Sequence, residues 1–343
     1  MSAAQQDWRP VATRERLVER AALLQRSREF FAARGLLEVD TPLVVNAPVS
    51  DVHLHAAAVR LTPESCAPSR ASPAPPMFLH TSPEYAMKRL LAAGSGDIWQ
   101  ICHVVRGLEC GRLHNPEFTL IEWYRIGFSL GQLMDEVEAL VRTLLGAAAS
   151  ARAGERISYR EAFLRELGLD PLAASIAALA QAARPLSLAG AAAPPADGGE
   201  PAGAERDQWL ELLMGALIGP RLGHRALTFV HGYPATQAAL ARLDPADTRV
   251  AQRFELYCDG VELANGFHEL ANADEQRARF ARDNQERQRR GLPVAGPDER
   301  LLAALAAGLP DCCGVALGFD RLLMLASGAS SIEEVLPFPT ARA

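Results

Sequence analysis

Two apolar runs separated by a charged loop give the chain its clearest pattern. The runs are Ile98 to Val105 and Phe118 to Ile126, and the loop between them holds glycines, a proline, two arginines and a histidine. Turn-forming residues between two such runs predict two antiparallel strands joined by a long loop that closes over an anion.

Side chains on the second of these strands must alternate between two faces. One face carries Phe118, Leu120, Glu122 and Tyr124. A packed strand face rarely includes a glutamate, because an unpaired buried carboxylate is costly. We therefore expect this face to serve a site, although a solvated sheet face with scattered polar groups is the plainer alternative.

Helical spacing of apolar residues predicts several further elements. Residues 16–34 form an amphipathic helix in this interpretation, and Gly35 follows at the position of a C-terminal cap. The run 36–42 suits an edge strand, because Pro42 limits sheet pairing. The same patterns predict helices over 129–145, 159–167 and 207–218, a short strand over 227–230, and loops over 61–76 and at Tyr233-Pro234.

The triplet Ser82-Pro83-Glu84 has the residue types that begin a helix. Serine is a good N-cap, proline suits the first helical position, and glutamate is favoured by the helix dipole. Helix initiation therefore explains these residues even without a function.

The strongest hairpin signal lies near the C-terminus, at an Asp259-Gly260 turn between two alternating runs. A two-residue turn here pairs Tyr257 with Glu262, so Glu255 and Glu262 project from one face, within reach of one divalent ion. Strict alternation sends Glu269 to the opposite face unless Gly266 hosts a bulge or bend. An exposed acidic hairpin is the structural alternative.

A glycine between an apolar strand and a helix marks a second anion-binding candidate. Gly318 permits a close backbone approach, and Arg321 lies in the first turn of the helix that follows.

Composition narrows the class of protein. The chain has 343 residues, a net charge of -6 and six cysteines without metal-ligand spacing, which argues against broad nucleic-acid binding, a disulfide framework and a zinc site. Its polar N-terminus and the lack of a long apolar run predict a cytoplasmic protein without a membrane span. We expect a single domain over 1–343, with a flexible insertion over 171–205, which is rich in Ala, Gly and Pro.

Three segments together resemble the signature motifs of class II aminoacyl-tRNA synthetases, specifically their lysine branch. Residues 36–44 are similar to motif 1, 106–125 to motif 2 and 314–325 to motif 3. The resemblance implies an α+β fold, with an antiparallel sheet flanked by helices. Only some fifteen residues precede the first helix of this domain, so we expect no anticodon-binding barrel. This arrangement resembles the truncated paralogues that modify translation elongation factor P.

The resemblance also implies roles for individual residues. Arg106 and Arg321 would be the catalytic cations on the phosphates. The ATP site would comprise Arg106, Gly107, Leu108, Arg112, His114, Asn115, Phe118, Glu262, Leu263, Gly318 and Arg321. Magnesium would be held by Glu255 and Glu262. The lysine pocket would comprise Ser82, Pro83, Glu84, Glu122, Tyr124 and Glu269.

One position departs from the family pattern. The family usually has Arg-Asn-Glu-Glu where this chain has Arg106-Gly107-Leu108-Glu109. Leucine cannot accept a hydrogen bond from the adenine amino group. A backbone carbonyl or Glu109 could take over this role.

By resemblance, the chain is expected to activate lysine or (R)-β-lysine with ATP and Mg²⁺ and to transfer it to a lysine side chain of translation elongation factor P. Motif 1 suggests a homodimer, and tRNA binding is not expected. The alternatives are a free-standing synthetase-like enzyme that charges another acceptor, and a catalytically silent binding protein.

Overall fold

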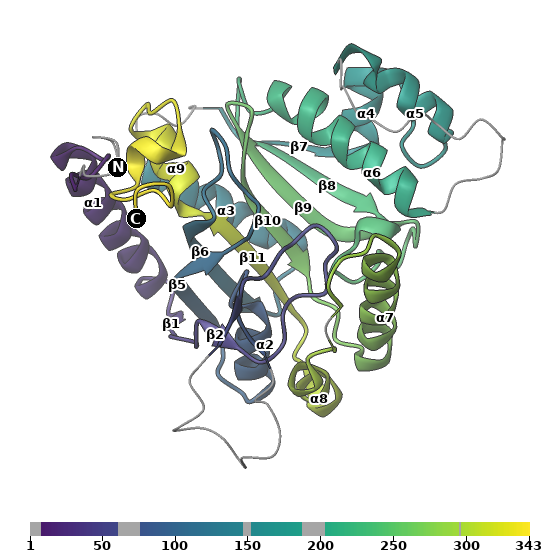
Figure 1. Cartoon of the computed structure of the whole chain (residues 1–343), viewed down its shortest axis with the longest axis horizontal. Coiled ribbons are helices and arrows are strands. Elements are labelled where there is room, and N and C mark those ends of the chain that lie inside the picture. Colours follow the sequence, from purple (N-terminus) through teal and green to yellow (C-terminus); the bar gives the residue numbers. More distant parts are fainter. Residues whose placement is uncertain (1–7, 61–75, 147–151, 187–202, 295) are drawn as a thin grey trace.

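An eight-stranded sheet runs through the centre of the computed structural model, which describes residues 8–60, 76–146, 152–186, 203–294 and 296–343 (Figure 1). The strand order is β1-β5-β6-β11-β10-β9-β8-β7, and all neighbours are antiparallel except the pairs β1–β5 and β7–β8. The strands are β1 (Leu37–Glu38), β5 (Ile98–Val105), β6 (Glu117–Ile126), β7 (Glu155–Ser158), β8 (Thr228–Pro234), β9 (Val250–Cys258), β10 (Val261–His268) and β11 (Cys312–Gly318). The α+β class with an antiparallel-dominated sheet is confirmed.

The predicted pair of strands lies next to the edge strand β1. β5 and β6 pair in antiparallel register, with Gln100 opposite Glu122, and β6 pairs with β11 on its other side. Alternation along β6 divides the two faces as expected: Ile121 and Trp123 join the main hydrophobic core, whereas Glu122 and Tyr124 lie on the opposite face.

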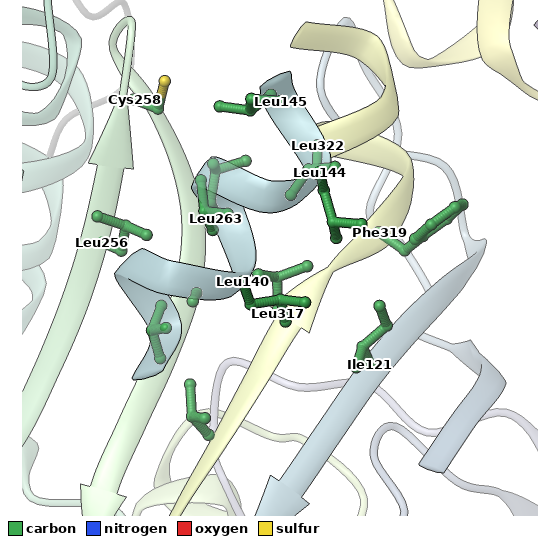
Figure 2. Close-up of a cluster of buried hydrophobic side chains, with 14 of the residues drawn as sticks. Ile121, Leu140, Leu144, Leu145, Leu256, Cys258, Leu263, Leu317, Phe319 and Leu322 are labelled. Atoms are coloured by element: carbon green, nitrogen blue, oxygen red, sulfur yellow. The ribbon is translucent and has the colours of Figure 1, made fainter. Parts of the chain in front are cut away.

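The main core lies between one face of the sheet and the helices α1 (Arg14–Ala32), α3 (Leu130–Leu145) and α9 (Phe319–Ala326). Figure 2 shows Leu140 of α3 beside Leu317 of β11, and Leu144 beside Leu322 of α9. The ends of α3 follow from the sequence, because Ser129 and Gln132 form a capping box and Gly146 takes a positive φ of 56°.

On the opposite face, a second core packs α2 (Glu84–Ala92), α7 (Ala273–Arg289) and α8 (Glu299–Gly308) against one end of the sheet. A small sheet of β2 (Val44–Val45), β4 (Met77–Leu79) and β3 (Ala58–Val59) lies nearby (Figure 1). This arrangement leaves part of β6, β10 and β11 available to a site.

The hairpin of β9 and β10 turns at Asp259-Gly260, as predicted, with positive φ at both residues. A bulge between Glu262 and Ala264 shifts the register, so Glu255 lies opposite Asn265. The bulge thus sits at Leu263 and not at Gly266, where the sequence offered a candidate. It brings Asn265, and with it Glu269, to the face that carries Glu262.

A satellite core forms where α4 (Tyr159–Leu167), α5 (Ile176–Ala183) and α6 (Gly203–Leu213) pack together. The expected insertion at 171–205 therefore contains a helix in its first part, whereas 187–202 lie outside the described residues. The predicted loop at 61–76 also lies almost wholly outside them. The loop predicted at Tyr233-Pro234 is wrong, because β8 continues to Pro234 by pairing with β9.

Within the part of the chain that the structure describes, no helix is long and apolar enough to cross a membrane. The cysteines described there are free thiols, and Cys66 lies outside the described residues.

Candidate active site

A cavity of about 240 Å³ opens on the face of the sheet opposite the main core. Its walls come from the loop between β5 and β6, from β6, β10 and β11, and from α9. The lining residues are Arg106, Glu109, Leu113, His114, Asn115, Phe118, Leu120, Glu262, Leu263, Ala264, Asn265, Ala316, Gly318, Asp320, Arg321 and Ile332. The structure thus brings together most of the residues that the resemblance assigns to ATP.

Arg321 of α9 ties three walls of this cavity together. Its guanidinium donates to the carbonyl oxygens of Leu113 at 3.2 Å and Glu262 at 2.9 Å, and lies 2.7 Å from Nε2 of His114. A guanidinium can only donate, so Nε2 of His114 accepts and its proton is on Nδ1. Burial, with Arg321 and Arg106 nearby, lowers the pKa of His114 to about 4. His114 is therefore neutral at pH 7, and the positive charge on this side of the cavity comes from Arg321 and Arg106.

Arg106 borders the same cavity and follows directly after β5. Its Nε donates to the carbonyl oxygen of Thr81 at 3.3 Å, and its guanidinium carbon lies 5.1 Å from the centre of the Phe118 ring. Two guanidinium groups therefore border one cavity, which suits a polyphosphate because arginine offers several fixed donors to phosphate oxygens.

Three residues of the assigned ATP set do not line the cavity. Leu108 is 84% exposed with a φ of 68°, Gly107 donates its N–H to the carbonyl of His55, and Arg112 donates to the carbonyl of Ser330. Glu109, in contrast, lines the cavity. Of the two substitutes that the sequence left open for the missing glutamate, the Glu109 side chain is one that borders the cavity.

Asn115 lines the cavity, but its side chain is already occupied by backbone groups. Its Nδ2 donates to the carbonyl of Glu117 at 2.6 Å, and its Oδ1 accepts from the N–H of Thr340 at 3.1 Å. Asn115 therefore joins the loop to the C-terminal segment.

The acidic hairpin places Glu255 and Glu262 on the same face. Both oxygens of Glu255 accept hydrogen bonds, from Arg253 at 2.7 Å and from the hydroxyl of Tyr257 at 2.6 Å. Burial and the charge of Glu255 raise the pKa of Glu262, although Arg321 opposes this shift. A cation would relieve this repulsion.

The described residues contain no group of three or more His, Cys, Asp or Glu side chains that could hold a metal ion. A divalent ion at Glu255 and Glu262 would therefore take its remaining ligands from phosphate oxygens and water, as magnesium does in nucleotide sites. The donor set fits magnesium on these terms.

A cluster of buried carboxylates, at the place of the expected lysine pocket, follows the cavity along the same face of the sheet. Leu120 and Ala316 line the cavity, and the residues two positions along these strands are Glu122 and Gly314. Two residues of a strand span roughly 7 Å, so the two sites adjoin.

Glu122 is the centre of this pocket. It is buried, and its oxygens accept hydrogen bonds from the hydroxyls of Ser82 and Tyr124, both at 2.8 Å. Burial and the neighbouring Glu84 raise the pKa of Glu122 to about 7. Ser82 also accepts from the N–H of Glu84, where α2 begins. The triplet therefore begins the helix and also contacts Glu122. The helix begins at Glu84, and Pro83 holds the N-cap position that the sequence assigned to Ser82.

Glu269 completes the pocket from the end of β10. It is buried, and burial raises its pKa to about 8 even though an ion pair with Lys88 acts in the opposite direction. Gly314 makes room for it, because a Cβ at Gly314 would lie 2.5 Å from the Oε1 of Glu269.

Sequence reasoning missed three polar residues of the site. Lys88 is 1% exposed and lies 2.8 Å from Glu84. Gln100 is buried opposite Glu122, and its side-chain amide has no hydrogen-bond partner among the described residues. Asp320 lines the cavity and accepts from the N–H of Thr119 at 2.6 Å. The signal for Lys88 was its helical spacing from Glu84, and the signal for Gln100 was its position opposite Glu122 in the pairing of β5 with β6.

Comparison with known proteins agrees with this geometry. A family model described as tRNA synthetases class II (D, K and N) matches residues 4–342. A protein of Vibrio cholerae named elongation factor P–(R)-β-lysine ligase is 49% identical over 337 residues, 98% of this chain and 99% of that protein. Proteins of the same name from Yersinia enterocolitica and Salmonella typhi are each 47% identical over 336 residues, 98% of both chains.

The two signature arginines, the acidic hairpin and the carboxylate pocket thus occur in a chain that matches this family over almost its whole length. The chain belongs to the class II tRNA synthetase family, in which it groups with the elongation factor P–(R)-β-lysine ligases.

Proposed function

We propose that this protein uses ATP to activate lysine or (R)-β-lysine and joins it to a lysine side chain of translation elongation factor P. The observation that carries the proposal is the junction of an arginine-bordered cavity with a pocket of three carboxylates, Glu84, Glu122 and Glu269. The names of the relatives, which cover the chain almost completely, support the choice of acceptor.

The carboxylate pocket suits a substrate with two ammonium groups. Ammonium groups leave water at a high cost unless carboxylates pair with them. An acidic amino acid would be repelled, and an apolar one would leave the buried carboxylates without partners. The pocket therefore favours lysine and its β-isomer over the other amino acids.

Activation follows from the way the two sites adjoin. With its ammonium groups among the glutamates, the substrate directs its carboxylate toward the cavity and Arg106. A carboxylate oxygen attacks the α-phosphorus of ATP, a new P–O bond forms, and pyrophosphate leaves from the opposite side. Arg106 and Arg321 stabilise the charge that spreads over the phosphate oxygens. Magnesium at Glu255 and Glu262 would neutralise part of the phosphate charge.

Transfer requires no covalent bond to the enzyme. The neutral amine of the acceptor lysine attacks the carbonyl carbon of the adenylate, an amide bond forms, and AMP leaves with the electron pair of the broken C–O bond. The nitrogen releases one proton to solvent as the amide forms. The enzyme holds the two reactants in line, which replaces a bimolecular encounter by an oriented one.

The test is magnesium-dependent exchange between ATP and pyrophosphate, with each amino acid in turn, followed by mass spectrometry of purified elongation factor P. We expect exchange with lysine or (R)-β-lysine and a mass gain on the factor. Charging of tRNA without modification of the factor would favour the free-standing synthetase. No exchange with any amino acid would favour the silent binding protein.

We also propose a homodimer formed through the motif 1 region. β1 is the edge strand of the large sheet, and Leu37 and Leu43 expose 55% and 40% of their surface there. Light scattering of the purified protein should give twice the mass of the chain. The variant Leu37→Asp should give the mass of a single chain.

A further inference from the structure

A buried lysine lies inside the acidic pocket itself. Lys88 is four residues after Glu84 on α2, and its Nζ lies 2.8 Å from Glu84 and 2.5 Å from Glu269. Glu–Lys pairs at this spacing usually stabilise exposed helices by a few tenths of a kcal/mol. Lys88 is different, because it is 1% exposed and also pairs with a carboxylate on another element.

Burial of this ammonium requires a specific reason. Moving an ion out of water costs several kcal/mol, and a well-packed apolar residue would often serve stability as well. Burial lowers the pKa of Lys88, but Glu269 and Glu84 outweigh this effect and hold the pKa above its ordinary value. Lys88 is therefore a permanent cation between two of the three pocket carboxylates.

The charges in the pocket match a particular class of substrate. Three carboxylates and one ammonium leave a net charge of two negative units when all are ionised. Burial raises the pKa of the neighbouring Tyr85, Cys102, Tyr124, Cys312 and Cys313, so these groups are neutral near pH 7. The charged groups that act on them from outside the pocket are Asp40, Asp97, Arg242, Asp283, Asp298 and Asp311. The remaining charge equals that of two ammonium groups.

We propose that Lys88 is a positioning residue that sets the charge of the pocket, so that a substrate with two ammonium groups neutralises it and displaces fewer protons than it would from a pocket without Lys88. This inference rests on the proposed function. The ammonium of Lys88 lies between the carboxylates of Glu84 and Glu269 and reduces the repulsion between them. Because it binds one oxygen of each carboxylate, it also fixes the direction of the other oxygen.

Without Lys88, three carboxylates would face each other, and the pocket would relieve the repulsion by taking up protons. Glu122 and Glu269 already have raised pKa values of about 7 and about 8. Because the positive charge of Lys88 lowers the pKa of Glu269, its removal raises this pKa further. Lysine would then bind only after displacing more protons.

The test is the pH profile of kcat/KM for lysine in ATP–pyrophosphate exchange, measured on the full chain. The variant Lys88→Met keeps the length of the side chain and removes the charge. We expect the acid limb of its profile to move up by about one pH unit, with a loss of about tenfold in kcat/KM at pH 7. Arg89→Met is the matched control, because Arg89 is an exposed cation on the same helix, and its profile should not move.

A double variant separates the charge from packing. Lys88→Met with Glu269→Gln restores the net charge of two negative units, and its acid limb should return toward that of the wild type, whatever its absolute KM. Calorimetry in buffers of different ionisation enthalpy gives a readout besides activity: lysine binding at pH 7 should release more protons from Lys88→Met than from the wild type.

The outcomes distinguish the two proposals. A folded Lys88→Met protein with an unmoved acid limb and unchanged proton release would overturn the role of Lys88 while leaving the proposed function intact. A wild-type protein that neither binds lysine or (R)-β-lysine nor supports exchange with them would overturn both. If Lys88→Met does not fold, a double variant whose acid limb differs from that of the wild type would overturn the charge assignment.

Discussion

Gly314 of β11 offers the sharpest test of how the proposed lysine pocket is built. A Cβ at this position would lie 2.5 Å from both Cδ1 of Tyr124 and Oε1 of Glu269. Non-bonded carbon atoms prefer separations of about 3.5–4.0 Å, so Gly314→Ala must displace a neighbour by roughly 1 Å. Neither neighbour moves freely, because Tyr124 donates to Glu122 and Glu269 pairs with Lys88.

The magnitude follows from the cost of overpacking. Extra methyl groups in packed sites cost about 1–3 kcal/mol. If this cost falls on the pocket, the KM for lysine should rise by roughly tenfold to a hundredfold, since about 1.4 kcal/mol corresponds to a factor of ten. The KM for ATP should change much less, because Gly314 does not line the nucleotide cavity.

The assay is ATP–pyrophosphate exchange with lysine and ATP varied separately, together with a thermal unfolding curve. Gly215→Ala is the control, because a Cβ there meets no atom within 4 Å. A folded Gly314→Ala protein with an unchanged KM for lysine would refute the placement of Tyr124 and Glu269 in the substrate pocket.

Three further predictions concern the nucleotide cavity and the titration of the pocket. Arg321→Ala removes a guanidinium from the wall of the cavity. A hydrogen bond from a charged donor to a phosphate is worth about 1.5–3 kcal/mol, so the KM for ATP should rise by at least about tenfold, and a wild-type KM would exclude Arg321 from nucleotide binding. Glu109→Gln should reduce discrimination between ATP and GTP and leave the KM for lysine unchanged. If the variant discriminates as well as the wild type does, a backbone acceptor is favoured instead. Because Glu122 and Glu269 have folded pKa values of about 7 and about 8, above those of the unfolded chain, the folded state binds more protons between about pH 5 and 8. The melting temperature of the ligand-free protein should therefore fall across this range if these groups dominate, and saturating lysine should reduce the fall; a steady rise would contradict the raised pKa values.

Much of the fold could be predicted because its signals are local. The alternation along β6 separates core residues from site residues, and the Asp259-Gly260 turn fixes the register at the tip of its hairpin. The helix start at Ser129 is likewise set by side-chain bonds to neighbouring backbone groups. In each case the relevant interactions join residues close in the sequence, so the pattern and its structural consequence coincide.

The site itself was only partly predictable. The resemblance to the synthetase motifs named the arginines and glutamates that line the cavity and pocket, but it did not distinguish Glu109, which lines the cavity, from Leu108, which faces solvent. That difference depends on the backbone conformation of the loop, where Leu108 adopts a positive φ.

The sequence by itself thus determined the strands, the turns and the residue types available for chemistry. Only the tertiary structure decided that a bulge at Leu263 brings Glu269 to the face of Glu262, and that Lys88 pairs with this glutamate. It also decided that Gly314 leaves the space in which Glu269 lies. These relations join residues far apart in the chain, and they arise because the buried charges find their partners only when α2, β10 and β11 pack on one another.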